Sequence, residues 1–531
     1  MAVLAPVRLP DEPDNETAVD RPSAFLPLTV LTLAFALSRV GFYLAGIRFD
    51  GSVLSGTSNT DMYQLVDVHL LHDQLITSLW HLESQPPLFN LYGGLVLKLP
   101  HGMQVPVEVI TFLILGLVLV LATYLLLTEL GVPRGVAIVA TLVLVVVAPA
   151  FVLYENWLNY AYPTAALLTL SGWLLLRYLR GKQWGYGLGF FAALSAVVLL
   201  NSTYQVEWLV VAVAVVVVVA RHRWRQVLKA AAIPVVVVGA WYVKDAVLFG
   251  TSSTSSWLGM NLARDTLYGA PHQEITAMVK DGTLTPLAAI PAFQGPATYI
   301  PRFVLPTHTG TAALDQLTKA DGAPNFNNPL YVSVSSQYLR DDLAFIAAHP
   351  GEYASDVNIS VRNWFTATDQ NFTPASNWPR IEGYTRIYDQ AVEWQPQIDP
   401  DVAIVAFFNH SPPGLNTLSY QAIAMFALTL LGLPVLAWRR RREDLAVAGT
   451  LAFLWLTVAY AFVVTSLVET GENERFRFEL GSLPAVGGIV VLVAICRASW
   501  ARARARGRGP GRRGPGPATA GHPEPVPPAT P

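Results

Sequence analysis

Cysteine is almost absent from this sequence, with Cys496 the single one among 531 residues. One thiol forms neither an intramolecular disulfide nor a zinc site built from several cysteines. Charged residues are also scarce, at 14% of the chain, whereas soluble domains contain about a quarter. Because 53% of the residues are hydrophobic, the composition predicts an integral membrane protein.

The chain also has no large excess of positive charge. Its formal net charge is -2, which gives no reason to expect nucleic-acid binding. Residues 1–22 contain acids and prolines and lack the basic start of a cleavable signal peptide, so we expect a disordered cytoplasmic N-tail followed by a retained first span. Residues 501–531 are basic and then rich in proline and glycine, and we expect a disordered cytoplasmic tail, with contact to anionic lipid as the alternative.

Long apolar runs are abundant. Each can cross about 30 Å of hydrocarbon as a helix, so the fold class predicted is an all-α polytopic membrane protein. The predicted spans are 25–46, 104–127, 134–153, 161–179, 187–201, 206–220, 229–248, 416–437, 445–466 and 479–497.

Basic residues gather in alternate loops, which predicts the orientation. With the N-terminus inside, the cytoplasmic loops contain Arg134, Arg177, Arg180, Lys182, Arg221, Arg223, Arg225 and the run Arg439 to Arg442. The opposite side receives the acids Asp50, Asp61, Asp67, Asp73, Glu83 and Glu155. We therefore expect a multi-pass protein of the cytoplasmic (inner) membrane with both termini cytoplasmic.

Two segments on the outer side are long. The first, 47–86, is acidic, and the second, 251–413, has the length of a small domain and contains amphipathic stretches. The predicted organisation is a transmembrane module over 23–250, a mainly helical extracytoplasmic insert over 251–413, and C-terminal spans over 414–500.

The stretch "HLESQPPLFNLYGG" interrupts the apolar sequence with Pro86 and Pro87. Residues 61–82 carry apolar residues at helical spacing among acids and histidines, which predicts a helix lying on the membrane surface. We expect the proline pair to turn the chain back into the bilayer, so that the segment forms one wall of a cavity at the outer interface. A simple turn between two membrane segments is the alternative.

Three motifs resemble the type-C glycosyltransferase superfamily (GT-C), in its bacterial branch related to protein mannosyltransferases and lipid A aminoarabinose transferases. "SQPPLFNL" is similar to that family's "HPPLYxLL", with Gln85 where histidine is frequent. "GAWYVKDAVLFG" resembles the motif that ends the seventh span, with Asp245 in place of asparagine. "ENERFRFELGSLPAV" resembles the start of a late span and lacks the first proline of that motif.

The resemblance implies a GT-C-like seven-span module followed by about three further spans. It also implies an inverting glycosyltransferase that moves a hexosyl or pentosyl group from a polyprenyl-phosphate carrier to a glycan, lipid or protein acceptor of the cell envelope. Such enzymes need no nucleotide sugar, and most that use monophosphate carriers need no cofactor, although a divalent metal stays open.

The resemblance also implies which residues act. Its catalytic base is an aspartate of the first outer loop, for which Asp50 in "GIRFD" and Asp61 in "NTDMY" compete. Glu155 is a further acidic candidate, in the second outer loop, where an aromatic belt at the interface would explain it equally. Tyr162 is expected to line the same cavity, as are Gln85, Pro86 and Pro87.

A cation must hold the departing phosphate, and a guanidinium suits that role. Arg475 is the first candidate, with pairing to Glu472 or Glu474 as its structural alternative. Lys244 and Arg48 are the next candidates; Lys244 could instead be an interfacial lysine, and Arg48 could pair with Asp50.

The first outer segment also contains three histidines. His69 and His72 share a helix face and His81 follows, but a third ligand is missing, so no metal site is predicted. A lipid or oligosaccharide transporter or flippase is the rival function, and a non-catalytic binding protein of the same fold is another. Transporters tend to carry charges near the bilayer midplane, whereas the polar residues here gather at one face.

Overall fold

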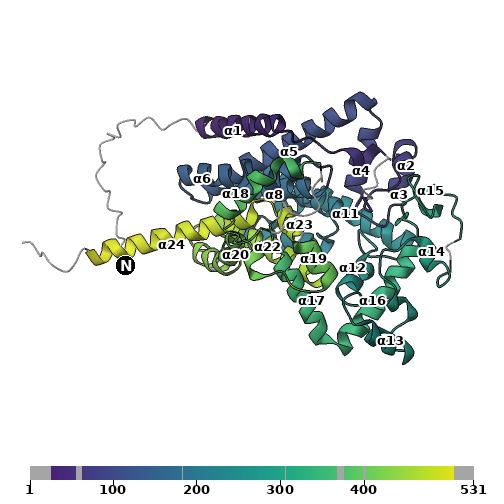
Figure 1. The fold of residues 1–531 in the computed structure, drawn as a ribbon. Helices are drawn as coiled ribbons and strands as arrows, with labels where there is room; N and C mark the ends of the chain where they lie inside the picture. Colours follow the sequence, from purple (N-terminus) through teal and green to yellow (C-terminus); the bar gives the residue numbers. More distant parts are fainter. Residues whose placement is uncertain are drawn as a thin grey trace, which may run out of the picture.

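The computed structural model describes residues 25–55, 62–181, 183–304, 307–367, 376–398 and 402–507, and within these ranges the fold is helical with no β-sheet. Two isolated backbone bridges, Asp50 with Trp157 and Thr318 with Pro324, are the β-type pairings in the described part. The predicted all-α class is therefore confirmed (Figure 1). Residues 1–22, and the tail beyond 507, lie outside the described ranges.

In the described part of the chain, six helical segments are long and apolar enough to cross a membrane, so the protein is a multi-pass membrane protein. They are α1 (Phe25–Leu44), α5 (His101–Glu129), α11 (Trp224–Phe249) with the short turn before it, α20 (Tyr420–Ala427) continued by α21 (Leu433–Arg440), α22 (Leu445–Val468) and α24 (Leu483–Gly507). In each of them the apolar run satisfies its backbone hydrogen bonds internally, as lipid requires.

The other four predicted spans are helical too, but they do not meet the same length and composition criteria alone. They are α6 (Arg134–Thr141) with α7 (Pro149–Glu155), α8 (Ala161–Gly181), α9 (Trp184–Leu200) and α10 (Val206–Val219). Helices α9 and α10 have 17 and 14 residues. The number of ten spans stays a prediction.

The predicted span 134–153 is helical but bent, a feature that the sequence did not indicate. Between α6 and α7 the chain forms a π-helical turn, Leu142–Val146, and the two helices differ in direction by 53°. Pro149 at the start of α7 lacks the N–H that would continue the helix. The bent pair counts as one span only if the break itself lies in the membrane.

Helix α8 lies at the centre of the bundle and packs against α5, α9 and α22. Its Gly172 permits this close approach, because an added Cβ would lie 3.1 Å from methyl groups of both Leu126 and Leu454. Helix α24 continues beyond the predicted end of the last span and through residues 501–507, since its Ala-Arg repeats favour helix. Figure 1 shows this helix extending away from the bundle.

The first outer segment forms two short helices, α2 (Val68–Asp73) and α3 (Leu75–Trp80), rather than the predicted single helix. Asp67 caps α2 by accepting a 2.8 Å hydrogen bond from the backbone N–H of His69. The two prolines then begin helix α4 (Pro87–Leu97), with Pro86 at the N-cap and Pro87 in the first turn. Proline is favoured at that position because its missing N–H needs no partner there.

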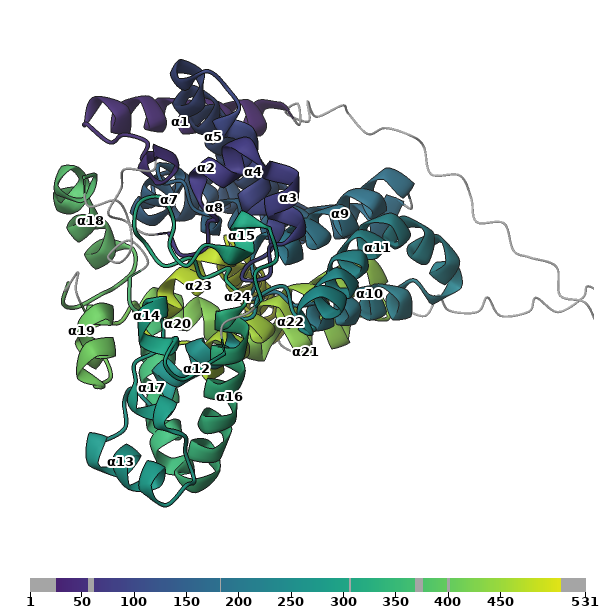
Figure 2. The same cartoon turned by 90° about the vertical axis from the view of Figure 1, so that its right-hand side faces the viewer.

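The insert, 251–413, is folded and helical as predicted. Its elements are α12 (Leu258–Asp265), α13 (His272–Lys280), α14 (Pro296–Tyr299), α15 (Ala312–Asp315), α16 (Leu330–Ala348), α17 (Pro350–Asn363), α18 (Trp378–Ala391) and α19 (Val402–Asn409). The part from α12 to α16 has a hydrophobic core of its own that includes Met260, Tyr299 and Tyr338. Helices α13, α16 and α17 extend away from the bundle (Figure 2), while α12 and part of α17 pack against α22, and α18 packs against α7.

Candidate functional site

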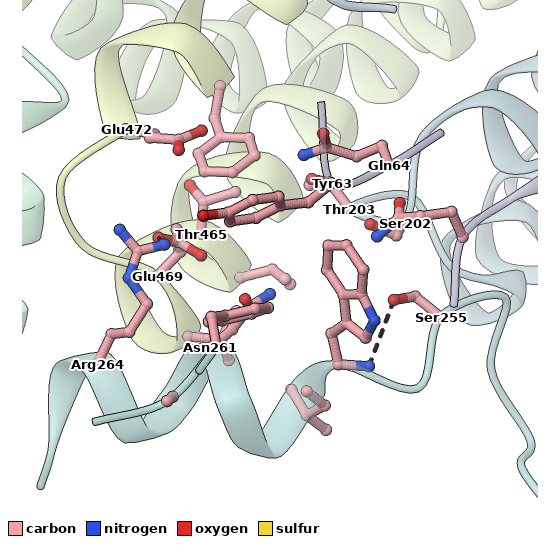
Figure 3. A pocket seen from close by; sticks show the side chains of 18 of the residues that line it. Tyr63, Gln64, Ser202, Thr203, Ser255, Asn261, Arg264, Thr465, Glu469 and Glu472 are labelled. Carbon is pink, nitrogen blue, oxygen red and sulfur yellow. Dashed lines mark hydrogen bonds and ion pairs between the residues drawn. The ribbon is translucent and has the colours of Figure 1, made fainter. Parts of the chain in front are cut away.

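A cavity of about 920 Å³ lies where the first outer segment, the start of α10, the insert and the end of α22 meet (Figure 3). The short helix α23 (Asn473–Glu479) closes one side of it. Its charged lining residues are Glu207, Arg264, Glu469, Glu472 and Arg475. Its volume lies within the range of small-molecule binding pockets, about 300–1,000 Å³.

Arg475 is the predicted cation that lines this cavity. It is 5% exposed, and its Nη1 donates to the hydroxyl of Tyr160 at 2.6 Å and to Glu479 at 3.2 Å. Its Nη2 pairs with Glu472, three residues earlier in the chain. Burial alone would lower the pKa of Arg475, but Glu472, Tyr160 and Glu479 raise it above its ordinary value, so the guanidinium is charged.

A second ion pair joins the insert to the membrane helices in the same cavity. Arg264 of α12 lies 2.9 Å from the carboxylate of Glu469, which caps the C-terminus of α22. Burial raises the pKa of Glu469 to about 7, and Arg264 opposes that rise. The cavity thus holds two arginine–glutamate pairs within one space.

Asp50 does not line this cavity, but the backbone of Asp50 is hydrogen-bonded to a segment that reaches the cavity. The N–H of Asp50 donates to the carbonyl of Asn156 at 2.8 Å, and its carbonyl accepts from the N–H of Leu158 at 3.1 Å. Two residues further, Tyr160 binds Arg475. The segment 156–160 therefore connects the first candidate base with the first candidate phosphate ligand. The side chain of Asp50 is half-buried and accepts a hydrogen bond from the N–H of Ser52.

The rival base, Asp61, lies outside the described residues. Glu155 and Tyr162 lie among the helices, and neither lines the cavity. The carboxylate of Glu155 forms two hydrogen bonds with Arg39 of α1, at 2.8 and 3.0 Å, and accepts one from the Tyr162 hydroxyl at 2.6 Å. Arg39, Glu155 and Tyr162 therefore form a buried group in which the polar side chains bind one another.

Lys244 and Arg48 also lie away from the cavity lining. Lys244 is buried, pairs with Asp245 at 2.6 Å and donates to the carbonyl of Leu82 at 2.6 Å. Through its hydrogen bond to Leu82, Lys244 holds the segment that precedes the two prolines. Arg48 is exposed and stacks on Tyr43 at 3.8 Å, rather than pairing with Asp50.

Of the three residues predicted to line a cavity around the proline pair, Gln85 does so, at 7% exposure. Pro86 and Pro87 are buried next to it and are not part of the lining. The segment is held by the insert, because Asn327 accepts from the N–H of Glu83 at 2.9 Å and Ser255 donates to the carbonyl of Ser84 at 2.7 Å. Burial raises the pKa of Glu83 to about 8.

Two of the three histidines of the first outer segment, His72 and His81, have protein partners for their side chains. His72 contacts Asp73 at 2.6 Å, and His81 contacts the carbonyl of Thr77 at 2.9 Å. Among the described residues, a group with the spacing of metal ligands lies in the insert instead, formed by Glu274, His349 and Glu352. His349 already pairs with Glu274 at 2.6 Å.

Several cavity residues were not predicted from the sequence. Arg264 and Glu469 are about two hundred positions apart, and no local pattern links them. Tyr160 follows Glu155 in a loop that was noted only for its acid and its aromatic residues. Glu472 was considered only as a partner of Arg475, at a spacing of three residues, and that pairing is present.

The sequence matches no family model and no curated protein. Among solved structures, the chain is similar to the archaeal oligosaccharyltransferase AglB from Archaeoglobus fulgidus, in complex with an inhibitory peptide and a dolichol-phosphate. The identity is 13%, the TM-score is 0.38, and the match covers 91% of this chain. This chain spans 52% of that structure's length, and at such a TM-score the likeness does not establish a shared fold.

Proposed function

We propose that this protein is an integral membrane glycosyltransferase of the GT-C type. It moves a sugar from a polyprenyl-phosphate-linked donor to an acceptor of the cell envelope, on the outer face of the cytoplasmic membrane. The general base is Asp50, with Asp61 as its rival, and Arg475 binds the phosphate of the donor.

The observation that carries the proposal is the link between Asp50 and Arg475 through residues 156–160. The backbone of Asp50 pairs with one end of this segment, and Tyr160 at its other end binds the guanidinium of Arg475. An acid that accepts a proton and a cation that stabilises a leaving phosphate are the two groups that glycosyl transfer requires. The adjoining cavity provides room for the sugars.

In the proposed reaction the carboxylate of Asp50 takes the proton of the acceptor hydroxyl as that oxygen attacks the anomeric carbon. The bond between this carbon and the phosphate oxygen breaks, and polyprenyl phosphate leaves with the electron pair. Attack from the opposite side inverts the anomeric centre. Arg475 stabilises the charge that develops on the phosphate. Its partner Glu472 has a 22% exposed side chain, so phosphate oxygens can replace that carboxylate.

The test is transfer of a radiolabelled sugar by purified protein in lipid nanodiscs. Polyprenyl-phosphate mannose, glucose and arabinofuranose serve in turn as donors, with a cell-envelope fraction as acceptor. We expect one donor to lose its label to the acceptor. Asp50→Asn should lower this transfer by about 10²- to 10⁴-fold, the usual contribution of a general base.

The matched control is Asp73→Asn, because Asp73 is an exposed acid of the same outer segment that contacts only His72 among the described residues. It should retain full transfer. Asp61→Asn is measured beside it. Full activity in both Asp50→Asn and Asp61→Asn would exclude the proposed base, and no transfer from any lipid-linked donor would exclude the proposed activity.

A further inference from the structure

Most of the charged side chains that line the cavity form ion pairs with one another. Arg264 pairs with Glu469 and Arg475 pairs with Glu472, while the remaining acid, Glu207, is exposed. Arg475 also binds Glu479 at 3.2 Å, so the two lining arginines are outnumbered by the glutamates around them. Apart from the phosphate position at Arg475, the cavity therefore offers little attraction for an anionic ligand.

Three side-chain amides in the cavity lining have no hydrogen-bond partner among the described residues. Those of Gln64, Gln85 and Asn261 form no hydrogen bond with the described part of the chain, although Gln85 is 93% buried by its 7% exposure. The neighbouring Gln205 differs, since its amide oxygen accepts from Tyr242 at 2.6 Å. Buried polar groups nearly always have partners, so the buried amide of Gln85 at the cavity wall points to a polar ligand. Gln64 and Asn261 are partly exposed and line the same cavity, where they can bind that ligand in place of water. Each amide offers both donors and an acceptor, which suits hydroxyl groups.

Aromatic rings form another part of the lining. Tyr63 of the first outer segment stacks on Phe293 of the insert, with centroids 6.4 Å apart and planes 14° from parallel. Trp257 meets Phe293 edge-on at 5.4 Å. Trp257 is 4% exposed, and its indole N–H has no hydrogen-bond partner among the described residues. Figure 3 shows Tyr63, Gln64 and Asn261 turned into the same space.

The backbone at Phe293 is strained. Its φ is +60°, in the left-handed region that residues other than glycine seldom adopt. Such strain persists where the surroundings hold it, and it clusters at binding sites. Here the contacts with Tyr63 and Trp257 hold the ring at the cavity wall.

We propose that this cavity binds a neutral saccharide. The amides of Gln64, Gln85 and Asn261 bind its hydroxyl groups, and Tyr63 and Phe293 contact the C–H face of a sugar ring. Both the donor's sugar and an acceptor glycan have this chemistry. The inference rests on the proposed function for the role of the saccharide as a substrate, whereas binding itself is independent of transfer.

Binding is measured on the purified full-length protein by saturation-transfer-difference NMR, with tryptophan fluorescence to give the dissociation constant. The probes are neutral manno-, gluco-, galacto- and arabino-oligosaccharides of two to four sugars, and a uronic-acid oligosaccharide serves as the charged comparison. We expect at least one neutral probe to bind more tightly than the charged one. Gln64→Ala and Asn261→Ala should each weaken that binding by tenfold or more.

Gln74→Ala is the matched control, because Gln74 is an exposed glutamine of the same outer segment outside the cavity lining. Its affinity should equal that of the unchanged protein. Tyr63→Leu keeps apolar bulk but removes the stacking ring, and it should also weaken binding. Thermal unfolding of every variant identifies loss of fold, and affinity is compared only among variants with unchanged unfolding temperature.

Two results overturn the inference: no neutral probe binds at millimolar concentration, or binding is equal in Gln64→Ala, Asn261→Ala and Gln74→Ala. Transfer activity in the presence of either result leaves the proposed function standing without this saccharide site. Saccharide binding without transfer from any lipid-linked donor supports the site and rejects the proposed function. Where both are present, a raised KM for acceptor alone in Asn261→Ala assigns the site to the acceptor glycan, and a raised KM for donor assigns it to the donor's sugar.

Discussion

Arg475 makes three contacts that depend on the shape of its guanidinium. One nitrogen binds both Tyr160 and Glu479, and another binds Glu472. A planar fork can serve acceptors in several directions at once, whereas the ammonium group of lysine is a single point charge. A positive charge alone is therefore insufficient to make all three contacts of Arg475.

We expect Arg475→Lys to lower sugar transfer at least tenfold and to lower the unfolding temperature, because the ammonium cannot reach all three acceptors and each buried acceptor left without a hydrogen bond costs about 1–3 kcal/mol. Transfer and thermal unfolding are measured on the same preparation. Arg386→Lys is the control, since Arg386 forms an exposed pair with Glu382 on α18. Wild-type transfer in Arg475→Lys would remove Arg475 from phosphate binding.

Glu83 provides a residue-scale prediction on pH. Its pKa is raised from an ordinary 4.5 to about 8, mainly by burial, with Asp245 of α11 adding to the rise and Ser256 and Lys244 opposing it. Because the folded state prefers the protonated acid, its contribution to stability is fully present below about pH 4.5 and is lost as pH rises through about 8. The segment it belongs to carries Gln85 into the cavity.

The unfolding temperature should therefore fall between pH 6 and pH 9, and Glu83→Gln should fall less over that interval. Thermal unfolding in one detergent, followed by tryptophan fluorescence, measures both proteins. Parallel curves for the two proteins would show that Glu83 ionises normally.

At the scale of elements, the first outer segment is packed tightly against the helix that begins at the proline pair. Gly94 of α4 lies against α2 and α3, and a Cβ there would meet the Leu75 side chain at 2.3 Å and the carbonyl oxygen of Leu71 at 3.3 Å. Glycine at this position lets the two elements approach. The same contact positions the segment that ends at Gln85.

Gly94→Ala should destabilise the protein by about 1–3 kcal/mol, as overpacking of a buried contact does. Gly102 offers the comparison: it lies in α5, and nothing lies within 4 Å of an added Cβ. Gly102→Ala should be neutral or slightly stabilising. The unfolding temperatures of the two variants test this, and equal values would contradict the close approach of α4.

At the scale of the whole molecule, the cavity exists because the insert folds back onto the membrane helices. Arg264 of α12 and Glu469 at the end of α22 join these two parts, with side-chain exposures of 24% and 8%. The first outer segment is joined to the insert as well, through Asn327 and Ser255. Each part contributes lining residues that the others lack.

Arg264→Met leaves Glu469 buried without its ion-pair partner and should cost about 3 kcal/mol of stability. The double variant Arg264→Met, Glu469→Leu should recover part of that loss, because no uncompensated charge is left buried. Thermal unfolding of Arg264→Met, of Glu469→Leu and of the double variant gives a double-mutant cycle. Additive losses would mean that the two residues do not interact across the junction.

The sequence by itself determined the helical membrane class, the approximate range of each apolar helix and the helical insert, because lipid leaves few alternatives for an apolar run and helical periodicity is local. It also led to the prediction that Gln85 lines a cavity, where Gln85 lies, and it left pairing of Arg475 with Glu472 or Glu474 open as the alternative to phosphate binding, since that spacing is local in the chain. It did not reveal the bend between α6 and α7 or the division of the first outer helix.

Only the tertiary structure decided which charged residues meet. Glu155 was expected near the active cavity or in an aromatic belt, and it is enclosed by Arg39 and Tyr162 instead. Asp50 is tied through its backbone to the segment that reaches Arg475. The pairing of Arg264 with Glu469, and the meeting of Tyr63 with Phe293, join residues distant in the chain. Long-range packing alone brings such groups together, because their contacts leave no spacing pattern along the sequence.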